Sequence, residues 1–166
     1  MSDQNNQPSN SFLIGLGSNI QPVENIKKAA ALLSQQSLQA SFSRVWQSEA
    51  VGSQGPDFLN AAALIAAPFS AQALKAEVLS RIENQLGRER SADKNAPRTI
   101  DLDILATNMT TVDPGLWQYA HNAVPAAELL PGLTARQTRR TLAETAILLA
   151  STQNIRLRQD IKLNLP

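Results

Sequence analysis

The chain has 166 residues, of which 43% are apolar, and its formal net charge is +1. This length and composition suit one well-filled core, and the chain is too short to suggest two full domains. The near-neutral charge gives no general attraction for nucleic acid, and the two Trp, one Tyr and four Phe are too few for a base-stacking surface. The absence of cysteine excludes disulfides, thiolate metal ligands and a thiol nucleophile, so a metal would be held by oxygen atoms or by the single His121. These ligands favour a hard cation such as Mg2+.

The first ten residues (MSDQNNQPSN) are polar and contain few residues that favour helix or strand. They predict a disordered tail over residues 1–10 and a single domain over residues 11–166. The tail lacks the basic start and apolar centre of a secretory signal, and no apolar run approaches the ~20 residues that a membrane-spanning helix needs. We therefore expect a cytoplasmic protein without membrane association. Because no long apolar stripe is left for a partner, we expect a monomer.

The first half of the domain predicts a strand, a helix and two further strands. Residues 11–17 form a short apolar run that ends in glycine, as in a buried strand. Apolar residues then recur at helical spacing over residues 22–36, which begin with a proline suited to a first helical turn. Residues 38–46 alternate between apolar and polar, which predicts a half-buried strand. A loop with two glycines and a proline at residues 48–57 leads to a further strand at residues 58–66.

A second helix and a fourth strand follow. Ser70 suits the N-cap of a helix that ends at Gly87. The apolar stripe of this helix consists of Leu74, Val78, Ile82 and Leu86. The charged residues 88–98 predict an exposed, mobile loop, and the alternation of residues 99–105 (TIDLDIL) predicts a strand.

The predicted order is strand, helix, strand, strand, helix, strand, which is the βαββαβ order of the ferredoxin-like α+β sandwich. Helical patterns at residues 125–130 and 139–149 predict additional C-terminal helices. The weaker alternation of residues 155–165 predicts an extra edge strand.

Two aspartates share one face of the predicted strand at residues 99–105. Asp101 and Asp103 are two residues apart, so both carboxylates emerge on the same side. Two like charges so close repel each other unless a cation lies between them, and carboxylates together with ATP oxygens commonly hold Mg2+. The alternative is a pair of solvated acids on a half-exposed strand.

Four cations precede this strand within eleven residues. They are Arg88, Arg90, Lys94 and Arg98. Arginine binds two phosphate oxygens at once, and phosphoryl transfer is catalysed mainly by positioning and charge neutralisation. A solvated basic loop is the alternative, but cations beside metal-binding acids form one coherent site for a metal-bound nucleotide.

Three other residues are candidates for contacts with substrates. Phe58 and Asn60 share a face of their predicted strand and combine a flat apolar surface with an amide that suits a heterocycle edge. His121 is the only side chain whose ordinary pKa lies near neutrality, so it suits proton handling or a phosphate contact. An ordinary packed Phe, an Asn at a strand edge and a histidine without a role are the alternatives.

Five segments share their order and spacing with a known family. They are LGSN at residues 16–19, SEAVG at 48–52, PDFLN at 56–60, IE and LGR at 82–83 and 86–88, and PRTIDLDIL at 97–105. In their order and spacing these segments resemble the 6-hydroxymethyl-7,8-dihydropterin pyrophosphokinase family, and the resemblance extends roughly over residues 12–106. The resemblance implies a ferredoxin-like monomer that binds ATP with two Mg2+ ions and the pterin. It implies transfer of diphosphate to the pterin hydroxymethyl group with release of AMP, a step in folate biosynthesis.

The resemblance also implies roles for ten residues of this chain. Asp101 and Asp103 would hold the two Mg2+ ions. The expected ATP-binding residues are Arg88, Arg90, Arg98 and His121, of which Arg88, Arg98 and His121 would be catalytic. The expected pterin-binding residues are Ser48, Val51, Phe58 and Asn60.

The last third departs from the family pattern. His121 stands where most family members have a Pro-His-Pro-like motif. The following residues 123–131 (AVPAAELLP) contain neither the arginine nor the aromatic residue that usually follow this motif. The sequence offers three substitutes for the missing cation: Arg136, Arg139 and Arg140. The departure leaves open a second hypothesis, a degenerate family member that binds ATP or pterin without turnover.

A third hypothesis uses the ferredoxin-like fold as an interaction module for nucleic acid or protein. Such modules present aromatic residues on the sheet with a basic surround. This sheet would present Asp101 and Asp103, which repel a phosphate backbone. The sequence therefore favours an enzyme that binds no nucleic acid.

Overall fold

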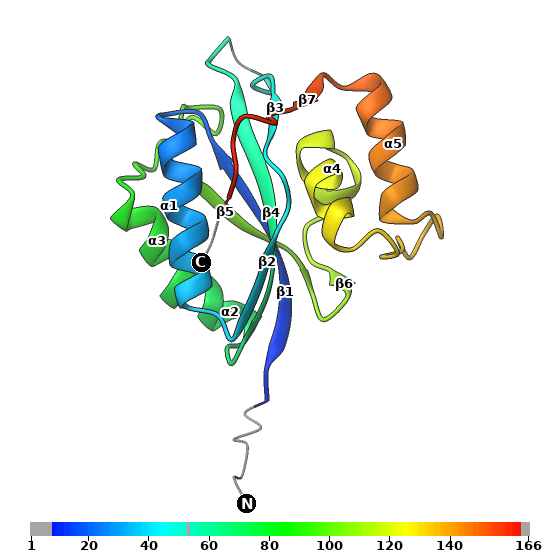
Figure 1. Cartoon of the computed structure of the whole chain (residues 1–166), viewed down its shortest axis with the longest axis horizontal. Coiled ribbons are helices and arrows are strands. Elements are labelled where there is room, and N and C mark those ends of the chain that lie inside the picture. The colour runs from blue at the N-terminus through cyan, green and yellow to red at the C-terminus, as the bar shows by residue number, and fades with distance from the viewer. Residues whose placement is uncertain (1–7, 53, 164–166) are drawn as a thin grey trace, which may run out of the picture.

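The computed structural model describes residues 8–52 and 54–163, and a central antiparallel sheet organises them. The three longest strands are β1 (Asn10–Ser18), β4 (Phe58–Ala67) and β5 (Asp101–Thr107). β1 pairs with β4 on one side and with β5 on the other. Helices cover both faces of the sheet, which gives three layers (Figure 1). A strand buried on both faces needs apolar residues at nearly every position, and the run FLIGL of β1 provides them.

Four shorter strands complete the sheet. They are β2 (Gln39–Phe42), β3 (Trp46–Ser48), β6 (Thr110–Thr111) and β7 (Ile155–Leu157). The order is β6-β5-β1-β4-β3-β7, and β2 pairs with the other half of β4. If β2 and β3 are counted as one strand, the central order β5-β1-β4-β2/β3 is the ferredoxin-like arrangement. The predicted α+β fold is confirmed. Of the predicted edge strand at residues 155–165, three residues form β7, residues 158–163 form no strand, and the last two lie outside the described residues.

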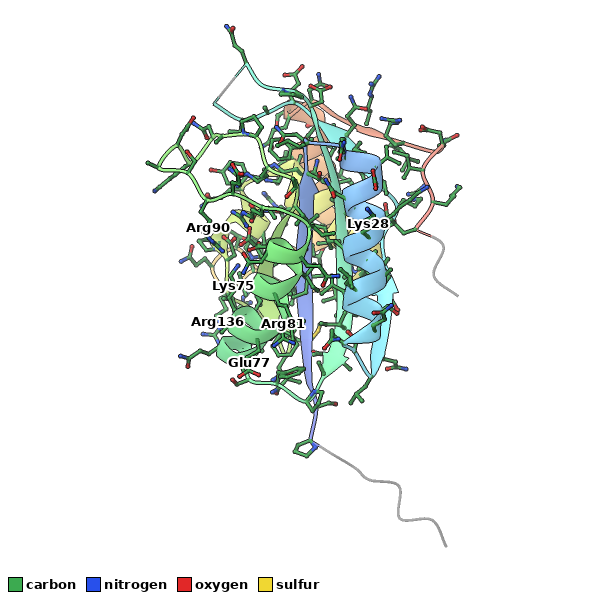
Figure 2. The ribbon with its side chains drawn as sticks, turned by 90° about the vertical axis from the view of Figure 1, so that its left-hand side faces the viewer. Lys28, Lys75, Glu77, Arg81, Arg90 and Arg136 are labelled. Atoms are coloured by element: carbon green, nitrogen blue, oxygen red, sulfur yellow. The ribbon has the colours of Figure 1, made fainter. Side chains whose placement is uncertain are left out.

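The first helical layer consists of α1 (Pro22–Gln35) and one long helical segment. That segment is made of α2 (Ala71–Ala73), η1 (Leu74–Leu79) and α3 (Ser80–Gln85). Figure 2 shows α1 and this segment in front of the sheet. They bury the even-numbered residues of β1 and the odd-numbered residues of β4, including Phe12, Ile14, Leu16, Ala61, Ala63 and Ile65.

The second helical layer lies on the opposite face. It consists of the short helix η2 (Pro114–Trp117) with α4 (Ala120–Leu129) and α5 (Leu142–Thr152). These helices pack on Leu13, Ala62 and Leu105 of the sheet. On this face β1 continues with Gly15 and Gly17, which have no side chains to fill the space, and a pocket opens there.

The predicted continuous strand over residues 38–46 is wrong, because a bulge divides it into β2 and β3. Phe42 pairs with Ala63 and Trp46 pairs with Asn60, so four steps on one strand face three on the other. One extra residue moves the following side chains to the other face of a sheet. Phe42 accordingly packs with the first helical layer and Trp46 with the second.

The predicted second helix exists but is not a regular α-helix. Ser70 caps it as expected, since its Oγ accepts a hydrogen bond from the N–H of Ala73 at 3.1 Å. Its residues 74–79 form the wider π-helical turn η1, and Gly87 at its end has a φ of +76°.

Several element boundaries differ from the predictions. The fourth strand was predicted over residues 99–105 and is β5. The two C-terminal helices were predicted over residues 125–130 and 139–149 and are α4 and α5, so the first begins five residues earlier than predicted. The predicted tail at residues 1–10 falls mostly outside the described residues, and Asn10 belongs to β1. Within the part of the chain described, no helix combines the length and apolarity needed to cross a membrane.

Candidate active site

The pocket lies on the face of the sheet that α4 covers only in part. Its floor is formed by Gly15 and Gly17 of β1. A Cβ atom at Gly15 would lie 3.3 Å from Leu105 Cδ1 and 3.5 Å from Asn122 Oδ1, so glycine allows these side chains to approach the strand. At Gly17 a Cβ would come within 3.6 Å of Asn60 Oδ1, and its absence keeps that oxygen beside open space.

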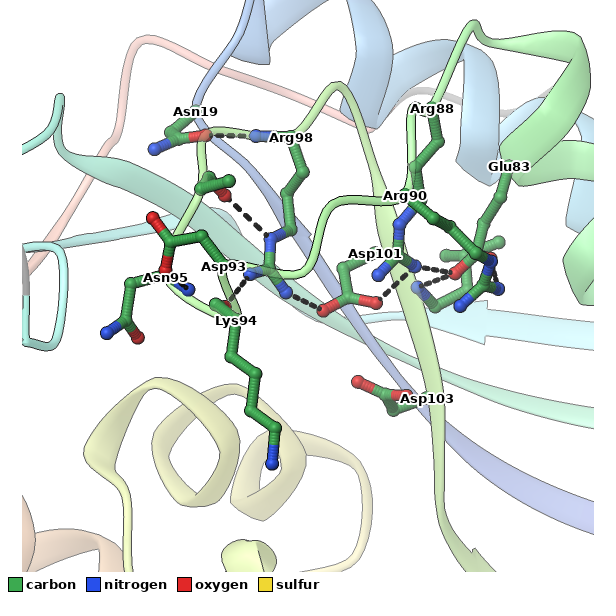
Figure 3. A network of polar contacts seen from close by, with 12 residues as sticks. Asn19, Glu83, Arg88, Arg90, Asp93, Lys94, Asn95, Arg98, Asp101 and Asp103 are labelled. Atoms are coloured by element: carbon green, nitrogen blue, oxygen red, sulfur yellow. Dashed lines mark hydrogen bonds and ion pairs between the residues drawn. The ribbon is translucent and has the colours of Figure 1, made fainter.

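Asp101 and Asp103 of β5 line one wall of the pocket, as the alternation predicted. Two guanidinium groups hold Asp101: Arg88 Nη1 lies 2.6 Å from Oδ1 and Arg98 Nη1 lies 2.7 Å from Oδ2 (Figure 3). Within the part of the chain that the structure describes, Asp103 has a single cationic partner, Lys75, whose Nζ lies 3.3 Å from Oδ1. Burial and the nearby charge of Asp101 raise the pKa of Asp103, and Lys75 opposes this rise only in part. The carboxylate pair is therefore a place where a further positive charge is favoured.

Glu83 of α3, which is 1% exposed, organises the arginines behind this wall. Its carboxylate bonds Arg88 and lies 3.1 Å from Arg90 Nη2, and it also accepts a hydrogen bond from the N–H of Leu102 at 2.9 Å. Burial lowers the pKa of Arg88, but the charges of Asp101 and Glu83 outweigh burial and the net change is a rise. Arg88 is therefore a permanent cation that joins the buried glutamate to the pocket.

The base of the loop at residues 88–98 is fixed by the segment that follows β1. Asn19 Oδ1 accepts a hydrogen bond from the N–H of Arg98 at 2.8 Å, and the N–H of Asn19 donates to the carbonyl of Arg98 at 3.1 Å. Ser18 Oγ donates to the carbonyl of Thr99 at 2.5 Å. The polar residues of the LGSN segment thus position Arg98 rather than face the pocket themselves.

Three of the expected pterin-binding residues lie on the opposite wall. Phe58 and Asn60 of β4 and Ser48 of β3 line the pocket together, and Val51 lies at its rim, 59% exposed. Asn60 Nδ2 donates to Ser48 Oγ at 2.9 Å, which fixes the orientation of the amide. The bulge between β2 and β3 is what turns Ser48 to this face.

The start of α4 closes the pocket from above the sheet. His121 and Asn122 line it, and the ring of His121 stacks on that of Tyr119 with centroids 5.2 Å apart. Burial lowers the pKa of His121, while the charges of Asp101 and Asp113 act in the opposite direction. His121 is therefore held mainly as a neutral imidazole near neutral pH, able to donate one hydrogen bond and accept another.

Eight of the ten predicted site residues line this one pocket. Arg88 and Arg90 do not: they line an adjacent hollow formed by their own loop, with Lys94 and Arg98 shared between the two. Of the three proposed substitutes for the missing arginine, Arg136 and Arg140 line a separate hollow beside β6 and α5. Lys94 is the additional cation that does line the pocket, and its side chain extends toward α4 (Figure 3).

Sequence reasoning missed Lys75 and Asn122. Lys75 was hidden because it lies in a predicted regular helix 28 residues before its partner Asp103. Asn122 was hidden because the start of α4 was expected five residues later in the chain. Only the neighbouring His121 hinted at the position of Asn122.

The donor set fits a hard divalent cation. Two carboxylates from one strand face the same space, and the pKa of Asp103 is raised first by burial and then by the charge of Asp101, so a cation between the two carboxylates would relieve both effects. Among the described residues no cluster of three or more His, Cys, Asp or Glu forms a complete protein metal site. The remaining ligands of such an ion would therefore be water molecules and substrate oxygens, as is usual for Mg2+.

Comparison with known families decides what this pocket belongs to. A family model described as 7,8-dihydro-6-hydroxymethylpterin-pyrophosphokinase (HPPK) matches residues 13–131. The chain belongs to the HPPK family. The match includes every residue that lines the pocket, and HPPK enzymes use ATP with Mg2+.

A solved HPPK structure shares the fold. It is the crystal structure of Plasmodium falciparum HPPK-DHPS wild type with SDX-DHP, which matches with a TM-score of 0.63 and 11% sequence identity. The match covers 89% of this chain and 46% of the other, so this chain spans about half the length of that HPPK relative. At this identity the likeness supports the fold, and the chemistry must be argued from the pocket.

Proposed function

We propose that the protein transfers diphosphate from ATP to the hydroxymethyl group of 6-hydroxymethyl-7,8-dihydropterin and releases AMP, a step in folate biosynthesis. The observation that carries the proposal is that one pocket of this HPPK-family chain brings the candidate residues together. It places two carboxylates and an arginine on one wall and Phe58, Asn60 and Ser48 on the other.

Asp101 and Asp103 are the proposed ligands of two Mg2+ ions, which would neutralise the phosphate chain of ATP and polarise it toward attack. To bind Mg2+, Asp101 would have to give up part of its ion pairing with Arg88 and Arg98. The guanidinium groups released in this way are then free to contact phosphate oxygens, so the ion pairs of the free protein hold the arginines close to where they act.

In the proposed reaction the pterin hydroxyl oxygen attacks the β-phosphorus of ATP. A bond forms between that oxygen and phosphorus, the bond from phosphorus to the oxygen that bridges the α and β groups breaks, and AMP leaves with both electrons. The hydroxyl proton passes to solvent or to a nearby base. The residues contribute alignment and charge neutralisation, and no covalent intermediate with the protein is needed.

On the pterin side, Phe58 offers a flat apolar surface and Asn60 an amide whose orientation Ser48 fixes. The backbone of Ser48 and Val51 is proposed to contact the polar edge of the ring. His121 at the start of α4 is proposed to donate a hydrogen bond to a phosphate oxygen.

The loop at residues 88–98 supplies the catalytic cations. Arg98 and Lys94 line the pocket. Arg88 and Arg90 line the adjacent hollow and form ion pairs with Glu83. Lys94 is the proposed replacement for the arginine that the residues after His121 lack. The protein is further proposed to act as a cytoplasmic monomer.

The decisive experiment incubates the purified protein with ATP, Mg2+ and 6-hydroxymethyl-7,8-dihydropterin and follows AMP by chromatography. We expect AMP to appear only when the pterin is present. The matched control omits the pterin, which separates the transfer from ATP hydrolysis.

If no AMP forms while calorimetry still detects binding of ATP with Mg2+, the transfer proposal is wrong and the chain is a binding protein that lost turnover. If neither product nor binding is found, the assignment of the pocket fails as well.

A further inference from the structure

Among residues 8–52 and 54–163, no strand pairs with the edge of β5 that faces away from β1 beside the two aspartates. β6 pairs with β5 only at its far end, at Ala106 and Thr107. The backbone of Leu102 is bonded instead by two side chains: Glu83 Oε1 accepts from its N–H at 2.9 Å, and Lys75 Nζ donates to its carbonyl at 2.9 Å. Two side chains of the helical layer thus make the backbone hydrogen bonds that a neighbouring strand would otherwise make, at the residue between the two aspartates.

The π-helical turn η1 explains why both side chains reach this edge. Glu83 follows Lys75 by eight residues, which in a regular α-helix is about 2.2 turns, so the two would point in directions roughly 80° apart. A π turn absorbs one extra residue, which reduces the difference to roughly 20°. The turn is closed by Ser80, whose Oγ donates to the carbonyl of Lys75 at 2.8 Å.

The ammonium of Lys75 makes a second contact, to Asp103 Oδ1 at 3.3 Å. Figure 2 shows Lys75 on the helical segment, on the side of the molecule where α1 also lies. The lysine therefore reaches around the free edge of β5 to a carboxylate that lines the pocket on the far face of the sheet. Within the described residues it is the only cation in ion-pair contact with Asp103.

We propose that Lys75 is a built-in counter-ion of the metal site, and that a divalent cation binds there by displacing the Lys75 ammonium from Asp103. This inference rests on the proposed function, because it takes Asp101 and Asp103 as the metal ligands. The lysine keeps its bond to the Leu102 carbonyl after displacement, so it stays within a few ångströms of the bound ion and repels it. Lys75 thus weakens cation binding to the free protein and keeps the carboxylate pair ordered until nucleotide brings the ion.

The test compares Mn2+ binding to the wild-type protein and to Lys75→Met, by electron paramagnetic resonance of the free ion and without nucleotide. Methionine keeps the apolar length of the side chain but removes the charge. We expect Lys75→Met to bind Mn2+ roughly threefold to tenfold more tightly, since a like charge a few ångströms away is removed from a half-exposed site. Unchanged or weaker binding, or no binding to either protein, would overturn the proposal.

Two variants separate charge from folding. Lys75→Arg keeps the cation and a donor for Leu102, so it is expected to retain the wild-type Mn2+ affinity. Lys28→Met removes an exposed lysine that pairs with Glu24 on α1, and no change is expected there. A gain in affinity in either variant equal to that of Lys75→Met would show that the effect is not specific to the Lys75 charge.

A double-mutant cycle locates the effect on Asp103. When Asp103→Asn has removed the partner charge, we expect the gain from Lys75→Met to shrink to less than about half, because no ammonium is then drawn into the cation position. A full gain in that background would contradict displacement from Asp103. AMP formation judges the proposed function separately: a protein that forms AMP but shows no gain in Mn2+ affinity refutes only the counter-ion role.

Discussion

At the scale of single residues, the two aspartates of β5 lie on the same face of the sheet but have different surroundings. The side chain of Asp101 is 20% exposed and bonds two arginines, whereas that of Asp103 is 50% exposed and bonds one lysine. The raised pKa of Asp103 means that its charge is disfavoured in the folded protein. The two carboxylates should therefore contribute unequally to stability. Both should be needed for catalysis, because both are proposed ligands of Mg2+.

We predict that Asp101→Asn lowers the free energy of unfolding by about 1–3 kcal/mol, because Arg88 and Arg98 lose their charged partner in a partly buried setting. Asp103→Asn should change it by less than about 1 kcal/mol, since its ion pair is half exposed. Both substitutions should abolish pterin-dependent AMP formation. Urea denaturation gives the stabilities, and an equal loss in the two variants would contradict the assignment of partners.

Alternation in the sequence was sufficient to place both carboxylates on one face, because the side-chain period of a strand is fixed at two. It was also sufficient to place Phe58 and Asn60 together. Alternation could not show that Arg88 and Arg90 form ion pairs with the buried Glu83, since these pairs depend on how α3 packs against β5. The role of Arg98 as a partner of Asp101 likewise depends on the fold.

At the scale of secondary-structure elements, local irregularities turn side chains toward the pocket. The bulge after β2 turns Ser48 to the pocket face, and the π turn η1 turns Lys75 to the edge of β5. Periodicity predicted a regular strand and a regular helix at these places. One extra residue leaves the composition of a segment almost unchanged, so neither irregularity has a signal in local sequence.

The start of α4 is a third element that the sequence misplaced. Its N-cap residue, Tyr119, makes no side-chain cap, and Pro125 inside the helix suggested a later start. The missing cap is supplied from α5: Gln153 Oε1 accepts a hydrogen bond from the N–H of Ala120 at 2.7 Å, and its Nε2 donates to the carbonyl of Gln118 at 2.9 Å. The end of α5 thereby fixes the turn that presents His121 to the pocket.

We predict that Gln153→Ala lowers the free energy of unfolding by about 1 kcal/mol, the typical cost of a lost helix cap. It should also reduce kcat for AMP formation more than it raises the KM for ATP, because the displaced His121 is one of several proposed phosphate contacts and the residues of β5 stay in place. Steady-state kinetics and urea denaturation check both parts. Thr152→Ala, one residue earlier at the exposed end of α5, is the matched control, and an equal kinetic effect there would contradict a specific role for Gln153.

At the scale of the whole molecule, the sheet separates two environments. One face is sealed by α1 and the segment from α2 to α3, and the other is only partly covered by α4 and α5 (Figure 1). The sequence predicted the ferredoxin-like half of this arrangement, since each element has a clear period. The position of the second helical layer depends on packing between distant segments, and the hollow over Gly15 and Gly17 results from it.

This arrangement leads to a prediction for the thermal stability of the molecule. ATP with Mg2+ at about one hundred times its dissociation constant should stabilise the folded protein by about 2.7 kcal/mol. For a chain of this size that corresponds to a rise in Tm of roughly 5–10 °C, measurable by calorimetry. ATP with EDTA should give a much smaller rise, because its phosphates would then face Asp101 and Asp103 without a cation between them.

The Asp103→Asn variant is the control for this measurement, since it should lose most of the Mg2+-dependent rise while folding normally. An equal rise with and without Mg2+ would mean that ATP binds away from the carboxylates. The hollow of the loop at residues 88–98 would then be the nucleotide site on its own. A large Mg2+-dependent rise in Tm without AMP formation would show that ATP binds beside the carboxylates of β5 and that this wall of the pocket is intact. The loss of turnover would then be assigned to the altered residues after His121.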